Sequence, residues 1–266
     1  MTQEKKELLV SWYRTLGCPA EYEADLHIYL ETVELDETAT AETYEEQDGA
    51  ANIVHYLYFC EQLKQRYIEK GISLDILYDS LQELFLWTRS RSNMAGKLSL
   101  TEIWWVKKTL TMKLFRLGRL NFCMGEEEHD LPQYGLPKGA PIMEVHIPRG
   151  DSLKAEECAA SFSQARAFFA TFFPEFSYQY FTCFSWLLDG KLKELLSEES
   201  NILRFAALFN VVLDEPSAET IRYVFGRGVT AENIGEAEAK TGLAKKVQER
   251  VLAGETFYES YGIIKK

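Results

Sequence analysis

Long apolar runs are missing from this chain. It contains no stretch of about 18 consecutive apolar residues, the length that a membrane-crossing helix needs. Its first residues, MTQEKKELLV, carry charges and lack the apolar core of a secretion signal. The sequence therefore predicts a cytoplasmic protein with no membrane partner.

Metal-binding patterns are also scarce. The five cysteines lie far apart without a Cys-x-x-Cys pair, and the four histidines are dispersed. Zinc sites need such ligands at short, defined spacings, so we expect no bound metal. Scattered cysteines in odd number favour free thiols in a reducing compartment.

Positive charge is in the minority. Lys and Arg number 29 against 41 Asp and Glu, which gives a formal net charge of −12. A surface of this sign repels phosphate backbones on average, although a small basic pocket remains compatible with it. The composition therefore argues against nucleic acid as the main partner.

Apolar residues are plentiful enough for a substantial core. The 266 residues are 46% hydrophobic and 13% aromatic, which suits one large domain or two modest ones. Apolar residues recur every three or four positions over 52–70 and 73–90, which predicts two helices, the second capped by Ser73. We predict a helical N-terminal domain at 1–100 that ends in a loop or linker over 91–100.

The second part, 101–266, mixes strand and helix patterns. Alternating polarity over 115–124 predicts a half-buried strand. A second strand, 142–147, stops at Pro148, and helical spacing then begins after Gly150. Asp151 or Ser152 can cap that helix, which Pro174 ends. Later segments are predicted as a strand at 178–188, one or two helices at 192–210, a strand at 219–226, a helix at 241–254 and a strand at 257–264.

The junction after strand 142–147 has features of an anion site. Unpaired N–H groups and the dipole at a helix N-terminus attract negative charge. Gly150 lets a ligand approach the backbone closely, and Arg149 adds a permanent positive charge that can form bidentate hydrogen bonds. Glu156 and Glu157 would repel a phosphate that they face. A pyrophosphate site and an ordinary tight connection therefore both fit this segment.

Three further positions are candidates for chemistry. Glu144 and His146 share a strand face, where either can accept a proton from an amine or both can simply face solvent. Cys183 would need an adjacent base to be a nucleophile, and its apolar neighbours favour an inert core thiol. Asn201 is either a helix start after Ser200 or a ligand contact.

Four segments, taken in order, resemble a known family: RLGRLNF, EVHIPRGDSL, CFSWLLD and SNILRF. The set is similar to bacterial proteins with an N-terminal helical acyltransferase-associated domain and a GNAT-like C-terminal domain. The resemblance covers most of residues 105–266 and, more loosely, the helical part. It implies an α+β protein whose helical subdomain precedes a GNAT-like mixed β-sheet flanked by helices, and acyl transfer from acyl-coenzyme A (acyl-CoA).

The resemblance also implies where the donor binds. In GNAT proteins the fourth strand, here 142–147, pairs with pantetheine, and the following turn, here Arg149 to Leu153, holds the pyrophosphate. The next strand, here 178–188, splays away to admit the acyl group. This chain departs from the usual glycine pattern of that turn, because Gly150 stands alone. The implied cofactor-binding residues are Ile147, Arg149, Gly150, Asp151, Ser152 and Asn201.

Direct attack of an amine on the thioester is the reaction that the resemblance implies. Glu144 would be the general base, with His146 as the alternative. A tyrosine would return a proton to the leaving thiolate: Tyr178, Tyr223 or Tyr261.

The leading hypothesis is therefore an N-acyltransferase that uses acyl-CoA, such as acetyl-CoA, as co-substrate. Its acceptor would be an unidentified small-molecule or peptide amine. One alternative is a non-catalytic GNAT-like binding or interaction module. A second is a thiol enzyme that uses Cys183.

Overall fold

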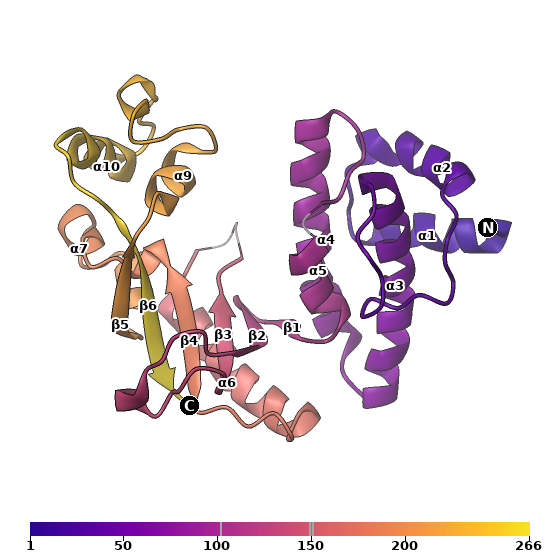
Figure 1. The fold of residues 1–266 in the computed structure, drawn as a ribbon, viewed down its shortest axis with the longest axis horizontal. Coiled ribbons are helices and arrows are strands. Elements are labelled where there is room, and N and C mark those ends of the chain that lie inside the picture. The colour runs from indigo at the N-terminus through magenta and orange to yellow at the C-terminus, as the bar shows by residue number, and fades with distance from the viewer. Residues whose placement is uncertain (102, 149, 151) are drawn as a thin grey trace. The chain divides into compact units, whose positions relative to one another are not determined.

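The computed structural model describes residues 1–101, 103–148, 150 and 152–266. The described chain forms two compact units, Met1–Leu117 and Gly118–Lys266. Figure 1 labels the helices and strands of both units.

Helices dominate the first unit. Asp48 begins α3 by accepting hydrogen bonds from N–H groups of the first turn, and Gly71 ends it in a left-handed conformation with φ of 69°. Ser73 caps α4 as predicted, but α4 continues to Ala95 into the predicted linker. The elements are α1 (Gln3–Thr15), α2 (Glu23–Thr32), α3 (Gly49–Lys70), α4 (Leu74–Ala95), α5 (Ile103–Leu110) and β1 (Leu114–Leu117).

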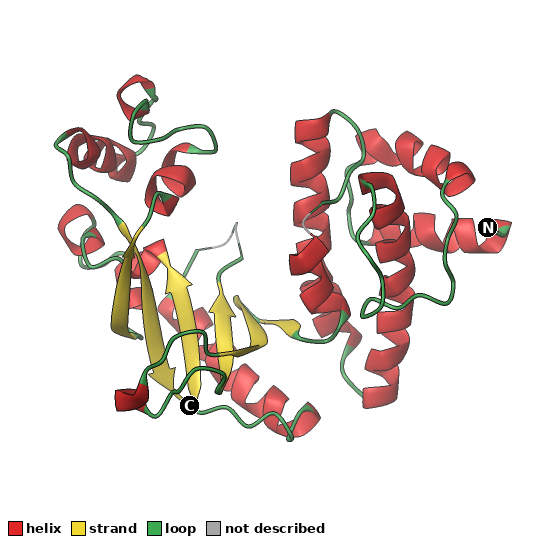
Figure 2. Cartoon of the chain, in the orientation of Figure 1, coloured by secondary structure: helices red, strands yellow, loops and turns green. Residues whose placement is uncertain are grey.

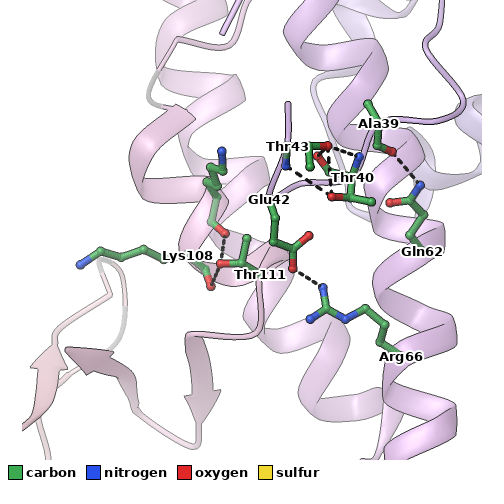
Figure 3. Close-up of polar contacts among 9 residues, drawn as sticks. Ala39, Thr40, Glu42, Thr43, Gln62, Arg66, Lys108 and Thr111 are labelled. Carbon is green, nitrogen blue, oxygen red and sulfur yellow. Dashed lines mark hydrogen bonds and ion pairs between the residues drawn. The ribbon is translucent and has the colours of Figure 1, made fainter. Parts of the chain in front are cut away.

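An irregular segment, residues 33–48, lies along α3 (Figure 3). The Gln62 side chain donates to the carbonyl of Ala39 at 3.1 Å, and Arg66 pairs with Glu42 at 2.7 Å. A half-exposed ion pair of this kind contributes about 1 kcal/mol or less. Both contacts come from successive turns of α3, so they fix the course of the segment along that helix.

The second unit is a mixed sheet with helices around it (Figure 2). Its strand order is β2-β3-β4-β6-β5; β3 and β4 are parallel, and the other described pairs are antiparallel. The strands are β2 (Leu120–Glu126), β3 (Pro141–His146), β4 (Tyr180–Ser185), β5 (Asn210–Pro216) and β6 (Tyr258–Lys265). The helices are α6 (Ala155–Phe172), α7 (Leu192–Leu195), α8 (Asn201–Ala206), α9 (Glu219–Phe225) and α10 (Gly242–Leu252). The predicted class, helices followed by a mixed sheet flanked by helices, is confirmed.

One face of this sheet is apolar and packs on α6. Phe162 of α6 contacts Phe122 of β2 and Phe181 of β4, with ring centroids 5.7 and 5.1 Å apart. Burying a large side chain of this kind stabilises the fold by about 1.5–3 kcal/mol. Cys183, two residues after Phe181 on β4, shares this face.

The opposite face carries the polar groups. The strand register places Glu144 beside Thr182 and Phe184 beside Tyr261 on this side. The segment between β2 and β3 crosses in front of β4 and β6 (Figure 1), and the Tyr180 hydroxyl donates to a carbonyl in it at 2.8 Å.

Several predicted elements differ from the observed ones. Residues 219–225 form helix α9 instead of a strand: the Ser217 hydroxyl accepts from the N–H of Glu219, and Arg222 pairs with Glu219 one turn later. The predicted strand over 115–124 is interrupted at Gly118, whose φ of 69° turns the chain between β1 and β2. Strand β5 was not predicted, because its residues follow directly on a helical pattern.

Candidate functional site

Glu144 and His146 meet on the polar face. His146 Nε2 lies 3.0 Å from Glu144 Oε2, and the two side chains are 35% and 26% exposed. The alternation of β3 places both on one side, as predicted from their spacing. A carboxylate on one ring nitrogen selects the tautomer with its proton there, which makes the other nitrogen, Nδ1, the proton acceptor. This carboxylate–imidazole pair can remove a proton from a nearby group.

Gly125 of β2 makes room for the Glu144 carboxylate. A Cβ atom at position 125 would lie 2.8 Å from Glu144 Cδ, closer than such atoms approach. Any side chain at this position would therefore displace the carboxylate from its place.

Strands β3 and β4 pair over a short length. The described pairs are Met143 with Phe181 and Glu144 with Thr182, while β3 continues to His146 and β4 to Ser185. The two strands run on past their last paired positions, and Glu144 stands at that point.

The turn after β3 contains the predicted donor-binding residues. Ile147 is half-buried, Gly150 is exposed with φ of 118°, and space is open where its Cβ would be. Arg149 and Asp151 lie outside the described residues.

Ser152 joins the turn to two distant residues. Its hydroxyl accepts from the Asn201 side chain at 2.7 Å, so two predicted positions 49 residues apart come together. Its carbonyl accepts from Arg119 Nε at 3.0 Å. Arg119 was not predicted as a site residue; it brings a permanent cation beside the turn from the start of β2.

Helix α6 begins later than predicted. Its first residue is Ala155 and its N-cap is Lys154, not Asp151 or Ser152, and no side chain caps it. Lys154 pairs with Glu157 at 2.8 Å. The predicted phosphate-binding residues therefore precede the helix, and its first turn carries an acidic side chain already paired with Lys154.

The three candidate tyrosines lie in different surroundings. Tyr178 packs on Phe169 of α6, on the apolar side of the sheet, and burial raises its pKa to about 12. Within the described residues its hydroxyl has no hydrogen-bond partner. Tyr223 is part of α9 and stacks on Trp186. Only Tyr261 of β6 lies on the polar face with Glu144.

A second carboxylate–imidazole pair lies near Tyr261. Glu127, just after β2, is buried and accepts from the Tyr261 hydroxyl at 2.5 Å. Its other oxygen contacts both the backbone N–H of His129 at 2.9 Å and Nδ1 of the same residue at 3.1 Å. Burial, and then the hydrogen bond to Glu127, raise the pKa of Tyr261 well above its usual range.

This pair was not predicted from the sequence. Residues 126–130 read EEEHD, a pattern typical of a solvated acidic loop. The available signal was the Glu-x-His spacing, which Glu127 and His129 share with Glu144 and His146.

Cys183 has little support as a nucleophile. Cys183 is buried, and burial raises its pKa to about 12, so the thiol stays protonated at neutral pH. In the described part of the chain, no group of three or more His, Cys, Asp or Glu side chains is placed to hold a metal ion. The helices of the same part include none with both the length and the apolar character to cross a membrane.

Solved acyltransferase structures have the same fold. An acyltransferase in complex with decanoyl-CoA and teicoplanin aligns at a TM-score of 0.75 with 22% identity, over 95% of this chain and 86% of that one. An acyltransferase in complex with decanoyl-CoA aligns at 0.70 with 24% identity, over 97% and 76%. At these identities the similarity establishes the fold. No curated protein matches the sequence.

Two family patterns divide the sequence between them. Residues 2–112 match the N-acyltransferase N-terminal domain, and residues 114–264 match the GNAT-like C-terminal domain. The second match alone spans more than half of the chain and includes both carboxylate–imidazole pairs. The protein belongs to the acyltransferase family in which an N-acyltransferase N-terminal domain precedes a GNAT-like C-terminal domain.

Proposed function

We propose that this protein is an acyl-CoA-dependent N-acyltransferase that acts on a small-molecule amine. The observation that carries the proposal is the hydrogen-bonded Glu144–His146 pair, which stands where the pairing of β3 and β4 ends. A thioester laid along β3 at this point would place its carbonyl next to a proton acceptor.

The donor in this proposal lies along β3 and the turn that follows. Pantetheine would pair with the strand up to Ile147, and the pyrophosphate would bind Gly150 and Ser152, with Arg149 and Asp151 as further predicted contacts. Asn201 supports this assignment, because it already holds the Ser152 hydroxyl. The aligned acyltransferases bind decanoyl-CoA, so longer acyl chains are as plausible a donor here as acetyl-CoA.

The reaction balances around one amine and one thioester. The amine nitrogen attacks the carbonyl carbon, the carbon–sulfur bond breaks, and an amide and the free thiol of CoA form. The nitrogen gives up a proton and the sulfur takes one. We assign proton removal to the Glu144–His146 pair, in which the carboxylate orients the ring and stabilises the imidazolium. The predicted role of Tyr178, return of a proton to the leaving thiolate, is not part of the proposal, because Tyr178 packs on α6 on the other side of the sheet.

The experiment measures donor binding and acyl transfer separately. Thermal unfolding with acetyl-CoA or decanoyl-CoA should show stabilisation, about 2.7 kcal/mol at a ligand concentration 100 times Kd. Release of the CoA thiol is then followed with a panel of small amines. Glu144→Gln and His146→Gln should keep binding and lose about a hundredfold in rate. Glu238→Gln, an exposed surface change, is the matched control.

The outcomes separate the possible functions. Thermal stabilisation by acyl-CoA without thiol release, with the same stabilisation in Glu144→Gln, would favour the non-catalytic binding module. No stabilisation by any acyl-CoA at millimolar concentration would overturn the proposal.

A further inference from the structure

The second pair, Glu127 with His129, has the geometry of a proton acceptor. The Glu127 side chain is fully buried, and its contact with His129 Nδ1 selects the tautomer in which that nitrogen carries the proton. The remaining nitrogen, Nε2, then holds a lone pair. The ring is 29% exposed, so this lone pair is within reach of solvent and of a ligand.

The tyrosine hydroxyl and the backbone hold the carboxylate in place. Glu127 accepts from Tyr261 and from the N–H of His129, so its position is fixed from β6 and from its own segment. The His129 ring also packs on the Tyr261 ring, with centroids 4.8 Å apart. The imidazole is therefore oriented from both sides before any ligand arrives.

A second negative charge faces the open nitrogen. Glu215 Oε1 of β5 lies 3.7 Å from His129 Nε2, and the Glu215 side chain is 51% exposed. Among the described residues, the charged and titratable groups that contact the ring are Glu127 from its own segment, Glu215 from β5 and Tyr261 from β6. An ammonium group next to Nε2 can donate one hydrogen to the imidazole and another to the Glu215 carboxylate.

We propose that His129, held by Glu127 and flanked by Glu215, receives acceptor amines in their protonated form and removes the proton that blocks attack. The inference rests on the proposed N-acyltransferase function and names its substrate class: primary alkylamines that are cationic at neutral pH. An alkylammonium must lose one proton before its nitrogen has a lone pair, and the attack then releases a second. His129 takes the first and passes it to solvent, and the Glu144–His146 pair takes the second, which balances the proton that the thiol gains.

The test compares two amines with wild-type protein and His129→Gln. One substrate is a primary alkylamine, which is cationic at neutral pH, and the other an arylamine, which is neutral and needs no prior deprotonation. His129→Gln should lower kcat/KM for the alkylamine by about a hundredfold, with a larger loss at lower pH, and change the arylamine by less than about threefold. His27→Gln, at an exposed histidine of α2, is the control and should match wild type for both.

Two further measurements guard against a merely structural effect. Thermal stabilisation of His129→Gln by decanoyl-CoA should equal that of the wild type. Glu215→Gln should raise KM for the alkylamine without changing kcat. The substitution removes the attraction between the Glu215 carboxylate and the ammonium group but leaves the base, His129, in place.

The results that overturn the inference are distinct from those that overturn the proposed function. Equal losses with both amines, or no loss with either, would overturn the role of His129 while acyl transfer itself stands. If the wild-type protein transfers no acyl group to either amine, the proposed function fails and the inference fails with it.

Discussion

At the scale of single residues, the missing side chain of Gly125 matters as much as the carboxylate that it accommodates. Glu144 is oriented by His146 on one side and has space on the other because position 125 has no Cβ. The atoms that would clash belong to the end of a long side chain, which can move away without disturbing the sheet. A larger residue would therefore act on the position of the carboxylate more than on the fold.

Gly125→Ala should leave the protein folded and impair catalysis. A displacement of about 1 Å at a catalytic group can lower the rate by about a hundredfold, so we expect a loss of that order in kcat. Binding of acyl-CoA, measured by thermal shift, should not change. Gly190→Ala is the control, because nothing lies within 4 Å of the added Cβ there. Equal activity of the two variants would contradict the positioning role of Gly125.

Cys183 should react only slowly with thiol reagents in the folded protein. Its pKa of about 12 leaves roughly one thiolate in ten thousand at pH 8, and the thiolate is the reactive form. Labelling by iodoacetamide should rise about tenfold for each pH unit up to the pKa and become fast in denaturant. Peptide mapping by mass spectrometry measures this. Rapid labelling of Cys183 in the folded protein at pH 7 would contradict this prediction and support the hypothesis of a thiol enzyme that uses Cys183.

At the scale of elements, the turn after β3 is held from two directions. Arg119 at the start of β2 and Asn201 at the start of α8 both contact Ser152, one through its carbonyl and one through its hydroxyl. From the sequence, Ser152 is a possible helix cap and Asn201 a possible ligand contact; the family resemblance assigns both to coenzyme binding, and Arg119 was not predicted. Their meeting depends on strand order, which local patterns do not encode.

Asn201→Ala should weaken donor binding. Loss of one neutral hydrogen bond is worth about 1 kcal/mol, so Kd for decanoyl-CoA should rise about fivefold with kcat nearly unchanged. Thermal shift titration gives the ratio. The control is Asn233→Ala, whose side chain bonds only within its own exposed loop. An unchanged Kd for Asn201→Ala would place the coenzyme elsewhere.

The element predictions succeeded where the local pattern was strong. Helical spacing located α3, α4 and α10, and the apolar run before Pro148 located β3. The prediction failed at 219–225, where β-branched and aromatic residues favour a strand. There the Ser217 hydroxyl accepts from the N–H of Glu219, and an i,i+3 ion pair between Glu219 and Arg222 supports a short helix. Tertiary context overrides weak propensity in such short segments.

At the scale of the whole molecule, the net charge of −12 bears on which substrates approach. A negative surface attracts cations over roughly a Debye length, about 8 Å at physiological salt, and repels anions. The anionic donor must overcome this field locally, and Arg119 is a described cation next to the proposed turn. The same negative field attracts the cationic acceptor amine.

Ionic strength should therefore separate the two amine classes. Raising salt should lower kcat/KM for a cationic alkylamine, because screening weakens long-range attraction, and leave a neutral arylamine unaffected. Initial rates across a salt series, at saturating decanoyl-CoA, measure this. The same salt response with both amines would indicate an effect on the donor or on the protein itself.

The sequence by itself determined the positions of α3, α4 and α10, the strand that carries Glu144 and His146, the sign of the surface charge and the family. All of these features follow from local spacing, composition or short motifs, and they do not depend on contacts between residues that are distant in the sequence. Only the tertiary structure decided that Glu127 contacts Tyr261, 134 residues later, and that Ser152 accepts hydrogen bonds from both Arg119 and Asn201. These contacts depend on strand order and register. The alternation along a strand determines which face a residue occupies, but it does not determine which residue of a neighbouring element it contacts.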